Sequence, residues 1–240
     1  MQLRRPARHA LVFSFSLLAF AGLSAAGPGA EGSGQITIRL EKKQAEQALT
    51  VPPTTVFKTG DVLRFRLTSS MAGYLYVVDK GSTGMTATLF PASGAQAGDN
   101  HILPARGYLV PADGEGWFEV TGPPGFDVLY FLVSARPMAL PPAPPSPEAL
   151  GKKAQPEAAL PPDLLPRCND EIFRSRGECL DETAGARALS PDAVLPREIA
   201  GLALGASRDI ILVDEGGQTS VRPAATAKLP LVYSFRLAHR

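Results

Sequence analysis

The amino-acid sequence predicts an all-β fold, either an antiparallel β-sandwich or an open barrel, and three observations carry this prediction. Residues 62–68 alternate apolar and polar side chains, as a strand with one solvated face does. Residues 74–78 are apolar throughout, which is typical of a strand buried on both faces. Short runs of this kind recur between turn residues, and that spacing favours a sandwich or barrel over an α/β arrangement.

The two runs form the predicted centre of the fold, a hairpin within residues 57–78 whose strands are separated by residues 69–73. Further strands are expected, in chain order, at residues 36–40 (a first edge strand), 85–90, 117–121 and 128–134, and residues 101–103 and 108–110 are short apolar pieces. The turn sequence Gly122-Pro123-Pro124-Gly125 joins the last two into a second predicted hairpin. Residues 41–49 have the composition of one or two helical turns.

Composition changes abruptly at Pro137, and there are ten prolines from there to Pro166. A segment of this kind is a semi-rigid spacer or a long surface insertion. The alternative is a ligand for a partner that reads polyproline in an aromatic groove.

Residues 167–205 are weakly helical by pattern. Asn169 or Asp170 can cap a helix that Gly177 ends. A second capped start, with proline at the first helical position, stands at Ser190-Pro191-Asp192.

The chain then returns to β-structure. Residues 209–213 have the composition of a buried strand, and a last strand alternates Leu231, Tyr233, Phe235 and Leu237 with more polar residues. Two strands cannot bury their faces alone. We therefore expect one β-sandwich-like domain over residues 27–240, with residues 137–205 as a proline-rich, weakly helical, disulfide-stapled insertion.

Residues 1–26 have the pattern of a secretory signal peptide. A basic start is followed by an apolar run over residues 10–23 and by small residues up to Ala26, after which we expect cleavage. That run is too short to read as a membrane span, and an ordinary basic start explains Arg4-Arg5 better than twin-arginine export. We expect a periplasmic or secreted protein with no membrane span after cleavage.

The charge balance bears on the class of partner. Without the three leader arginines the chain has 21 basic and 23 acidic residues and no basic run. This balance argues against nucleic acid or an anionic membrane surface as the partner.

Cys168 and Cys179 are the two cysteines of the chain. In an oxidising compartment we expect them to form a disulfide, which would stabilise the fold by about 3 kcal/mol on the chain-entropy estimate. A zinc site or a redox centre is the alternative, but the histidine ligands and the C-x-x-C spacing that such sites use are missing.

Catalytic signals are weak. His101 and His239 are the histidines beyond the leader, and no nucleophile motif surrounds a serine, so we interpret His101 as a loop residue. A secreted hydrolase using the carboxylates of Asp113, Glu115 and Glu119 is the alternative, although turn solvation and strand alternation also explain them. Phosphate loops, dinucleotide glycines and metal-ligand spacings are absent from the sequence, so no cofactor or metal is expected.

Binding is the remaining class of function. Tyr74, Tyr76 and Trp117 could form an aromatic platform for a sugar or peptide, although in strands this apolar such residues more often belong to the core. An exposed sheet edge could also receive a partner strand.

Several of these residues, in this order and spacing, resemble one bacterial family, the domain of unknown function 4384. The matching positions within residues 57–137 are Gly60-Asp61, Gly73 to Asp79, Gly84, Leu89-Phe90-Pro91, Asn100 and Gly122-Pro123-Pro124-Gly125. After Gly125 this chain departs from the pattern, with Phe126-Asp127 in place of a glutamate. The resemblance implies a β-rich accessory module, often found beside caspase-like peptidase or protein kinase domains, and it supplies no catalytic residues.

Two hypotheses follow. The first is a non-catalytic extracytoplasmic module that binds another envelope or secreted protein, and the second is the secreted hydrolase. A smooth sandwich with a filled interior favours the first, and a cavity that gathers the three carboxylates favours the second.

Overall fold

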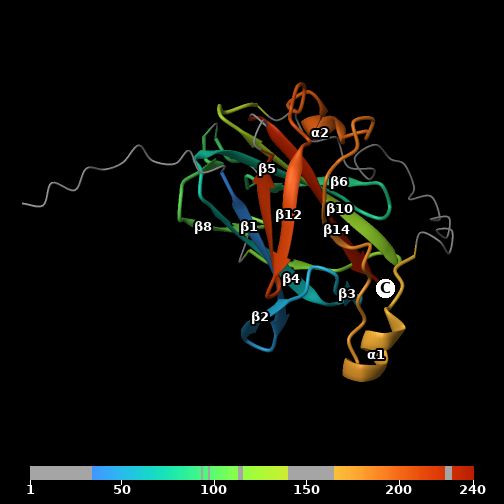
Figure 1. Ribbon diagram of the computed structural model, residues 1–240. Coiled ribbons are helices and arrows are strands. Elements are labelled where there is room, and N and C mark those ends of the chain that lie inside the picture. Colours follow the sequence, from blue (N-terminus) through green and yellow to red (C-terminus); the bar gives the residue numbers. More distant parts are fainter. Residues whose placement is uncertain (1–33, 93, 97, 113–115, 140–164, 225–228) are drawn as a thin grey trace, which may run out of the picture. The chain divides into compact units, whose positions relative to one another are not determined.

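Two β-sheets face each other across a shared core in the computed structural model (Figure 1). The structure describes residues 34–92, 94–96, 98–112, 116–139, 165–224 and 229–240. Residues Ser33–Arg240 group as one compact unit. The predicted leader, residues 1–26, lies outside the described residues, as does most of the proline-rich segment.

The first sheet has a central path of five strands and two strands beside it. In spatial order the path is β12 (Ile210–Glu215), β13 (Gln218–Pro223), β1 (Ile36–Gln44), β4 (Val62–Ser69) and β8 (Gly107–Val110). Beside this path, β2 (Gln47–Val51) pairs with β1, and β9 (Phe118–Glu119) pairs with β4.

The second sheet has the same plan. Its path is β11 (Gly185–Arg187), β14 (Leu231–His239), β10 (Gly125–Ser134), β5 (Gly73–Lys80) and β6 (Thr86–Phe90). In addition, β3 (Val56–Phe57) pairs with β14, and β7 (His101–Ile102) pairs with β5. The pairing of β3 with β14 is parallel, and the other strand pairings are antiparallel.

The core lies between the sheets because every second residue of each strand points inward. Phe65 of β4 meets Phe131 and Phe235 of the second sheet edge-to-face, with ring centroids 6.1 and 5.0 Å apart. Ile36, Ile38 and Leu40 of β1 and Leu75 and Val77 of β5 belong to the same buried cluster. The fold is therefore an antiparallel β-sandwich in the main, as the sequence predicts.

Both predicted hairpins are wrong. β4 and β5 follow each other in sequence, but β4 lies in the first sheet and β5 in the second. β9 and β10 are divided in the same way on either side of the Gly122–Gly125 turn. At both places the chain crosses from one sheet to the other, as in sandwiches whose consecutive strands lie in different layers.

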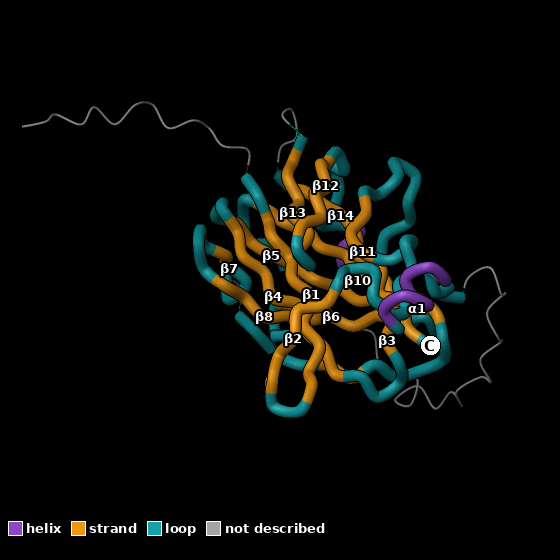
Figure 2. The backbone as a smooth tube through the Cα atoms, turned by 60° about the horizontal axis from the view of Figure 1, so that its bottom comes forward, coloured by secondary structure: helices purple, strands orange, loops and turns teal. Residues whose placement is uncertain are grey.

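Residues 41–49 are also different from the prediction, because they complete β1 and form β2 instead of a helix (Figure 2). The tight turn between the strands places Ala45 at φ 53°. β1 is not an edge strand, because it pairs with β13 and β2 on one side and with β4 on the other. The alternation of residues 36–40 reflects one buried face and one solvated face, which an interior strand of a sandwich also has.

In the last third of the chain one helix prediction is confirmed and another is wrong. α1 (Asp170–Arg176) has Asn169 as its N-cap and Gly177 as its C-cap. Ser190-Pro191-Asp192 forms a turn, and the second helix, α2 (Arg197–Ala200), begins after Pro196.

The two C-terminal strand predictions have different outcomes. β12 is an edge strand with Ile211 52 % exposed, so the predicted buried strand is wrong there. β14, by contrast, is buried along almost its whole length between β10 on one side and β11 and β3 on the other.

Two separate segments cover parts of the outer face of the second sheet. Near α2, Ile199 and Ala203 pack on Tyr76, Tyr130 and Leu132. Near the opposite end of β10, Cys179 and Ala184 pack with Phe126 and Ala238. Figure 1 shows α2 and α1 at opposite ends of the sheet.

These contacts do not decide where the inserted segment begins and ends. The insertion of residues 137–205 in one domain therefore stays a prediction. Within the described part of the chain, no helix combines the length and apolar character needed to cross a membrane.

Candidate functional site

The outer face of the first sheet carries a row of polar side chains on β1 and β4. The strand register places Thr37 opposite Thr68, Arg39 opposite Arg66 and Glu41 opposite Arg64. Their neighbours in sequence, Ile38, Leu40, Phe65 and Leu67, point into the core. The period of two that builds the core therefore also collects these polar groups on one face.

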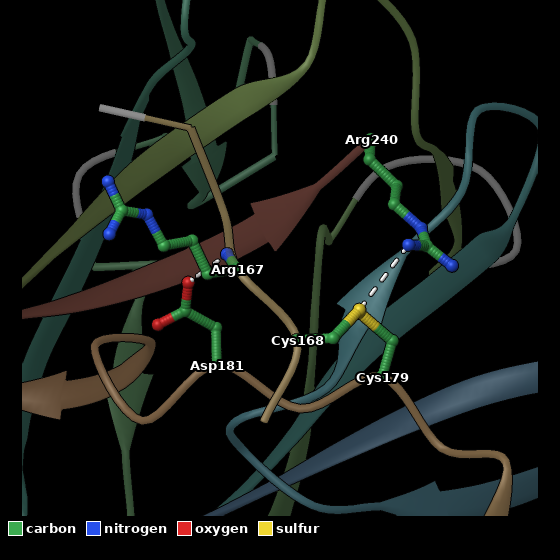
Figure 3. Close-up of a disulfide and its surroundings, with 5 residues drawn as sticks. All are labelled: Arg167, Cys168, Cys179, Asp181 and Arg240. Atoms are coloured by element: carbon green, nitrogen blue, oxygen red, sulfur yellow. Dashed lines mark hydrogen bonds between the residues drawn. A yellow bond between two sulfur atoms is a disulfide. The ribbon is translucent and has the colours of Figure 1, made fainter. Parts of the chain in front are cut away.

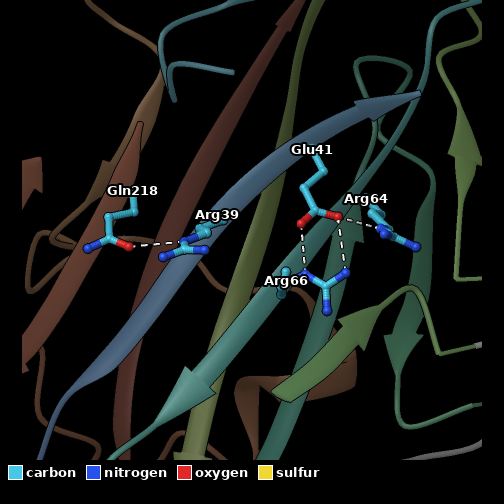
Figure 4. Close-up of polar contacts among 5 residues, drawn as sticks. All are labelled: Arg39, Glu41, Arg64, Arg66 and Gln218. Atoms are coloured by element: carbon cyan, nitrogen blue, oxygen red, sulfur yellow. Dashed lines mark hydrogen bonds and ion pairs between the residues drawn. The ribbon is translucent and has the colours of Figure 1, made fainter. Parts of the chain in front are cut away.

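Glu41 is the centre of this row and is only 6 % exposed. Arg64 Nε donates to Glu41 Oε2 at 2.6 Å, and Arg66 Nε donates to Glu41 Oε1 at 2.7 Å (Figure 4). Burial raises the pKa of the Glu41 carboxyl, but the hydrogen bonds from Arg66 and Arg64 outweigh burial and hold that pKa below its ordinary value of 4.5. One carboxylate thus fixes two arginines on a rigid sheet.

Trp117 covers one end of the row. The centroid of its ring lies 4.0 Å from the guanidinium carbon of Arg64. In this stacked position the face of the indole ring attracts the cation. Trp117 directly precedes β9, whose pairing with β4 brings the indole to this place. Stacking on Trp117 and pairing with Glu41 leave the Arg64 side chain 13 % exposed, whereas that of Arg66 is 39 % exposed.

Arg39 lies directly opposite Arg66, and like charges in this position repel each other. Arg39 Nε donates to the neutral Gln218 Oε1 at 3.0 Å (Figure 4). Among the described residues, no ion pair joins Arg39 to a carboxylate. A hollow of about 230 Å³ is lined by Arg39, Arg66 and Gln218 together with Thr37 and Thr68.

A second hollow of about 420 Å³ continues along the seam between β1 and β4 and shares Thr37 and Thr68 with the first. Gln35 and Ser70 line its far end. Beside it, Arg222 Nε donates to Gln35 Oε1 at 2.8 Å. The two hollows together form a trough, hereafter the polar trough. Hydroxyl and amide groups line most of it, with Arg39 and Arg66 in the first hollow and Pro104 and Ala105 in the second.

The face defined by Arg39, Glu41, Arg64, Arg66 and Trp117, hereafter the arginine face, has three cations and one carboxylate. Guanidinium groups present paired N–H donors that match the two oxygens of a carboxylate. Within the described part of the chain, both Nη atoms of Arg39 and Nη1 of Arg66 have no hydrogen-bond partner, so these donors can take such a group. The arrangement can therefore hold an anion without any covalent chemistry.

The aromatic residues predicted as a platform do not come together. Tyr76 is 1 % exposed, and its hydroxyl donates to Met138 O at 2.8 Å and accepts from Met138 N at 2.6 Å. Tyr74, on the same strand of the second sheet, stacks on His101 with centroids 4.8 Å apart. Trp117 lies at the first sheet, beside Arg64.

The carboxylates of the hydrolase hypothesis are only partly described. Asp113 and Glu115 lie outside the described residues, and Glu119 is exposed on β9. The structure contains another group of titratable side chains, which the sequence pattern did not indicate. In this group, His239 Nε2 lies 3.3 Å from Asp127 Oδ1. His239 is 0 % exposed, so a substrate has no access to its imidazole in this conformation.

Asp79 belongs to the same buried group. Its Oδ1 is buried without a hydrogen-bond partner among the described residues. Burial, with a smaller contribution from the charge of Asp127, raises the pKa of Asp79 to about 8. Burial, more than the nearness of the Asp127 carboxylate, thus favours a protonated Asp79 at neutral pH.

The predicted disulfide is confirmed, because Cys168 and Cys179 are bonded to each other (Figure 3). Arg240 Nη1 donates to Cys168 Sγ at 3.3 Å, and Asp181 accepts from the backbone N of Arg167 at 2.7 Å. Among the described residues, no three histidine, cysteine or acidic side chains are placed to hold a metal ion.

The fold and the arginine face define a two-sheet β-sandwich protein with a cationic outer face. Residues 56–137, about a third of the chain, match a family described as Domain of unknown function (DUF4384). The matched segment includes Arg64, Arg66 and Trp117, while Arg39 and Glu41 precede it. No curated protein and no solved structure matches the chain.

Proposed function

We propose that the protein is a non-catalytic extracytoplasmic accessory module that binds an acidic segment of another envelope or secreted protein on the arginine face. The observation that supports this best is the excess of arginine on a rigid sheet, where Arg39 lies opposite Arg66 and has a neutral partner. The two guanidinium groups would each take a carboxylate of the partner, which also relieves their mutual repulsion. The polar trough would hold the adjoining backbone.

The disulfide and the leader pattern support the extracytoplasmic part of the proposal, because disulfides persist in oxidising compartments. Intact-mass measurement of the native protein tests the leader. A periplasmic product that begins at Gly27 is expected. A cytoplasmic product that still carries residues 1–26 would contradict export.

Binding is tested with a fluorescein-labelled peptide of alternating Glu and Gly, followed by anisotropy at several salt concentrations. We expect R39Q/R66Q to weaken binding by about tenfold and to reduce the salt dependence, since two charge-assisted contacts are lost. The matched control is R174Q/R176Q, which removes two arginines from α1. Trp117 is the one tryptophan of the chain, so its fluorescence reports contact near Arg64 independently.

The proposal would be overturned if both double variants bound the acidic peptide as the unsubstituted protein does. It would also fail if a peptide with Gln in place of Glu bound equally well.

A further inference from the structure

The outer face of the second sheet has two cations on either side of an apolar strand. Strand pairing places Lys80 of β5 and Arg236 of β14 on opposite sides of Val128 in β10. Since neighbouring strands are about 4.8 Å apart, the two backbone positions are about 10 Å apart. This separation leaves room for a flat group between the two charges.

The floor between them is an apolar strip on β10. Phe126, Val128 and Tyr130 share this face because they alternate along the strand. The guanidinium carbon of Arg236 lies 3.9 Å from the Phe126 ring, so the stack fixes the direction of that cation.

The strip is open at Val128, between the two segments that cover the sheet, whereas Tyr130 at its end is only 8 % exposed. The α2 segment packs on Tyr130, and the disulfide segment packs on Phe126. Between them is a hollow of about 440 Å³, lined by Lys80, residues 81–84 of the following turn, the β10 strip and Arg236. This volume is within the range of small-molecule sites.

The charged side chains that line the hollow, Lys80 and Arg236, are both cations, and the neighbouring Asp127 carboxylate accepts from Ser82 N at 2.7 Å. Among the described residues, no ion pair joins Lys80 or Arg236 to a carboxylate. Asp181 is near enough to act on Arg236, but it already accepts hydrogen bonds from the backbone of Arg167 and from Thr183. Arg187 adds a further positive charge beside Arg236.

We propose that this hollow binds an aromatic ring that carries a carboxylate or phosphate on a short link. The ring lies on the Phe126–Val128–Tyr130 strip, and the anion pairs with Arg236 or Lys80. A free small molecule and the C-terminal aromatic residue of a peptide both have this chemistry. The site is on the opposite sheet from the arginine face and does not depend on the function proposed above.

The test follows backbone amide shifts of residues 81–84 by NMR while the full chain is titrated with small probes. Phenylacetate and phenyl phosphate have both ring and charge, acetate has only the charge, and benzyl alcohol has only the ring. We expect the first two to bind at least about tenfold more tightly than the last two, because only they use both parts of the hollow. A peptide ending in Phe, as free acid and as amide, separates the two sources of ligand.

Substitutions then locate the site. Lys80 is exposed, so K80Q leaves the fold intact, and we expect it to weaken phenyl phosphate binding by about three- to tenfold. R236K keeps the charge but loses the planar stack and should also weaken binding. K43Q, on the first sheet, is the matched control and should bind as the unsubstituted protein does.

Equal affinity for acetate and phenylacetate, or for the peptide acid and its amide, would overturn the proposal. So would unchanged phenyl phosphate binding in K80Q. R39Q/R66Q should leave these titrations unaltered, and a loss of binding there would place the anion on the arginine face instead.

Discussion

The Glu41 carboxylate contacts both Arg64 and Arg66, and its replacement by glutamine tests what those contacts contribute. The folded pKa of Glu41 lies below 4.5, so its stabilisation is present above that pH and is lost as the pH falls through the folded pKa. We expect E41Q to lower the free energy of unfolding by about 1–3 kcal/mol at pH 7. The loss should be smaller at pH 3.

Urea unfolding at the two pH values measures the effect of E41Q. E119Q, an exposed residue on β9, is the control and should change stability by less than about 0.5 kcal/mol. An equal loss at pH 3 and pH 7 would assign the effect of E41Q to packing and not to charge.

The contribution of Asp79 to stability depends on pH in the opposite direction. Its folded pKa is raised from 3.8 to about 8, so the folded state keeps a proton that the unfolded chain releases. Stability therefore falls as the pH rises between these values, and the loss is complete above about pH 8. Because asparagine cannot ionise, we expect D79N to raise the free energy of unfolding by about 2–4 kcal/mol at pH 9 and to change it little at pH 4.

Thermal or urea unfolding across this pH range provides the measurement, with the exposed E215Q on β12 as the control. A gain in D79N that did not depend on pH would show that the substitution acts through shape or hydrogen bonding.

At the scale of the elements, strand positions were largely predictable from the sequence, but strand partners were not. Alternation in residues 62–68 and the apolar run at 74–78 both match strands, because core burial imposes those patterns locally. Turn residues show that the chain reverses or bends, yet the same glycines and prolines serve a hairpin and a crossing between sheets. The pairing of β4 with β1 and of β5 with β10 depends on packing between segments that are separated in sequence.

Apart from Trp117, the residues of the candidate site were missed for the same reason. Arg64 and Arg66 were visible as the solvated side of a strand, but Glu41 fell in a stretch of good helix formers. Pairing with β4 and β2 overrides that propensity. The C-cap at Gly177, by contrast, was predictable because a left-handed φ of 71° is a local requirement that glycine satisfies.

The N-cap of α1 is a local feature that can be tested alone. Asn169 Oδ1 accepts from the backbone N of Glu171 at 3.1 Å and of Ile172 at 3.3 Å. We expect N169A to cost about 1 kcal/mol of local helix stability and to speed hydrogen exchange of those two amides by about fivefold. N169S retains a capping oxygen and should exchange nearly as the unsubstituted protein does. If N169A and N169S exchange alike, the side chain does not cap the helix.

At the scale of the whole molecule, each sheet needs strands from both ends of the described chain. β14 pairs with β10, and β13 pairs with β1. A fragment of residues 35–136 lacks β13 and β14, so β1 and β10 would each lose a paired neighbour. We therefore expect it to lose cooperative unfolding and the near-ultraviolet circular dichroism of the full chain, since each large apolar side chain returned to water costs about 1.5–3 kcal/mol.

The matched control is a fragment of residues 35–240. If residues 35–136 remained soluble, monomeric and cooperatively folded, the single-domain interpretation with an insertion at residues 137–205 would be wrong.

The place of β14 also affects how the protein is made. β10 is complete long before β14 leaves the ribosome, and until then one long side of β10 has unpaired backbone groups next to some of the most apolar residues in the chain. Such an edge invites pairing with other chains. A chain synthesised only as far as β10 therefore has an aggregation-prone edge at residues 125–134, and this exposure ends when β14 pairs with it.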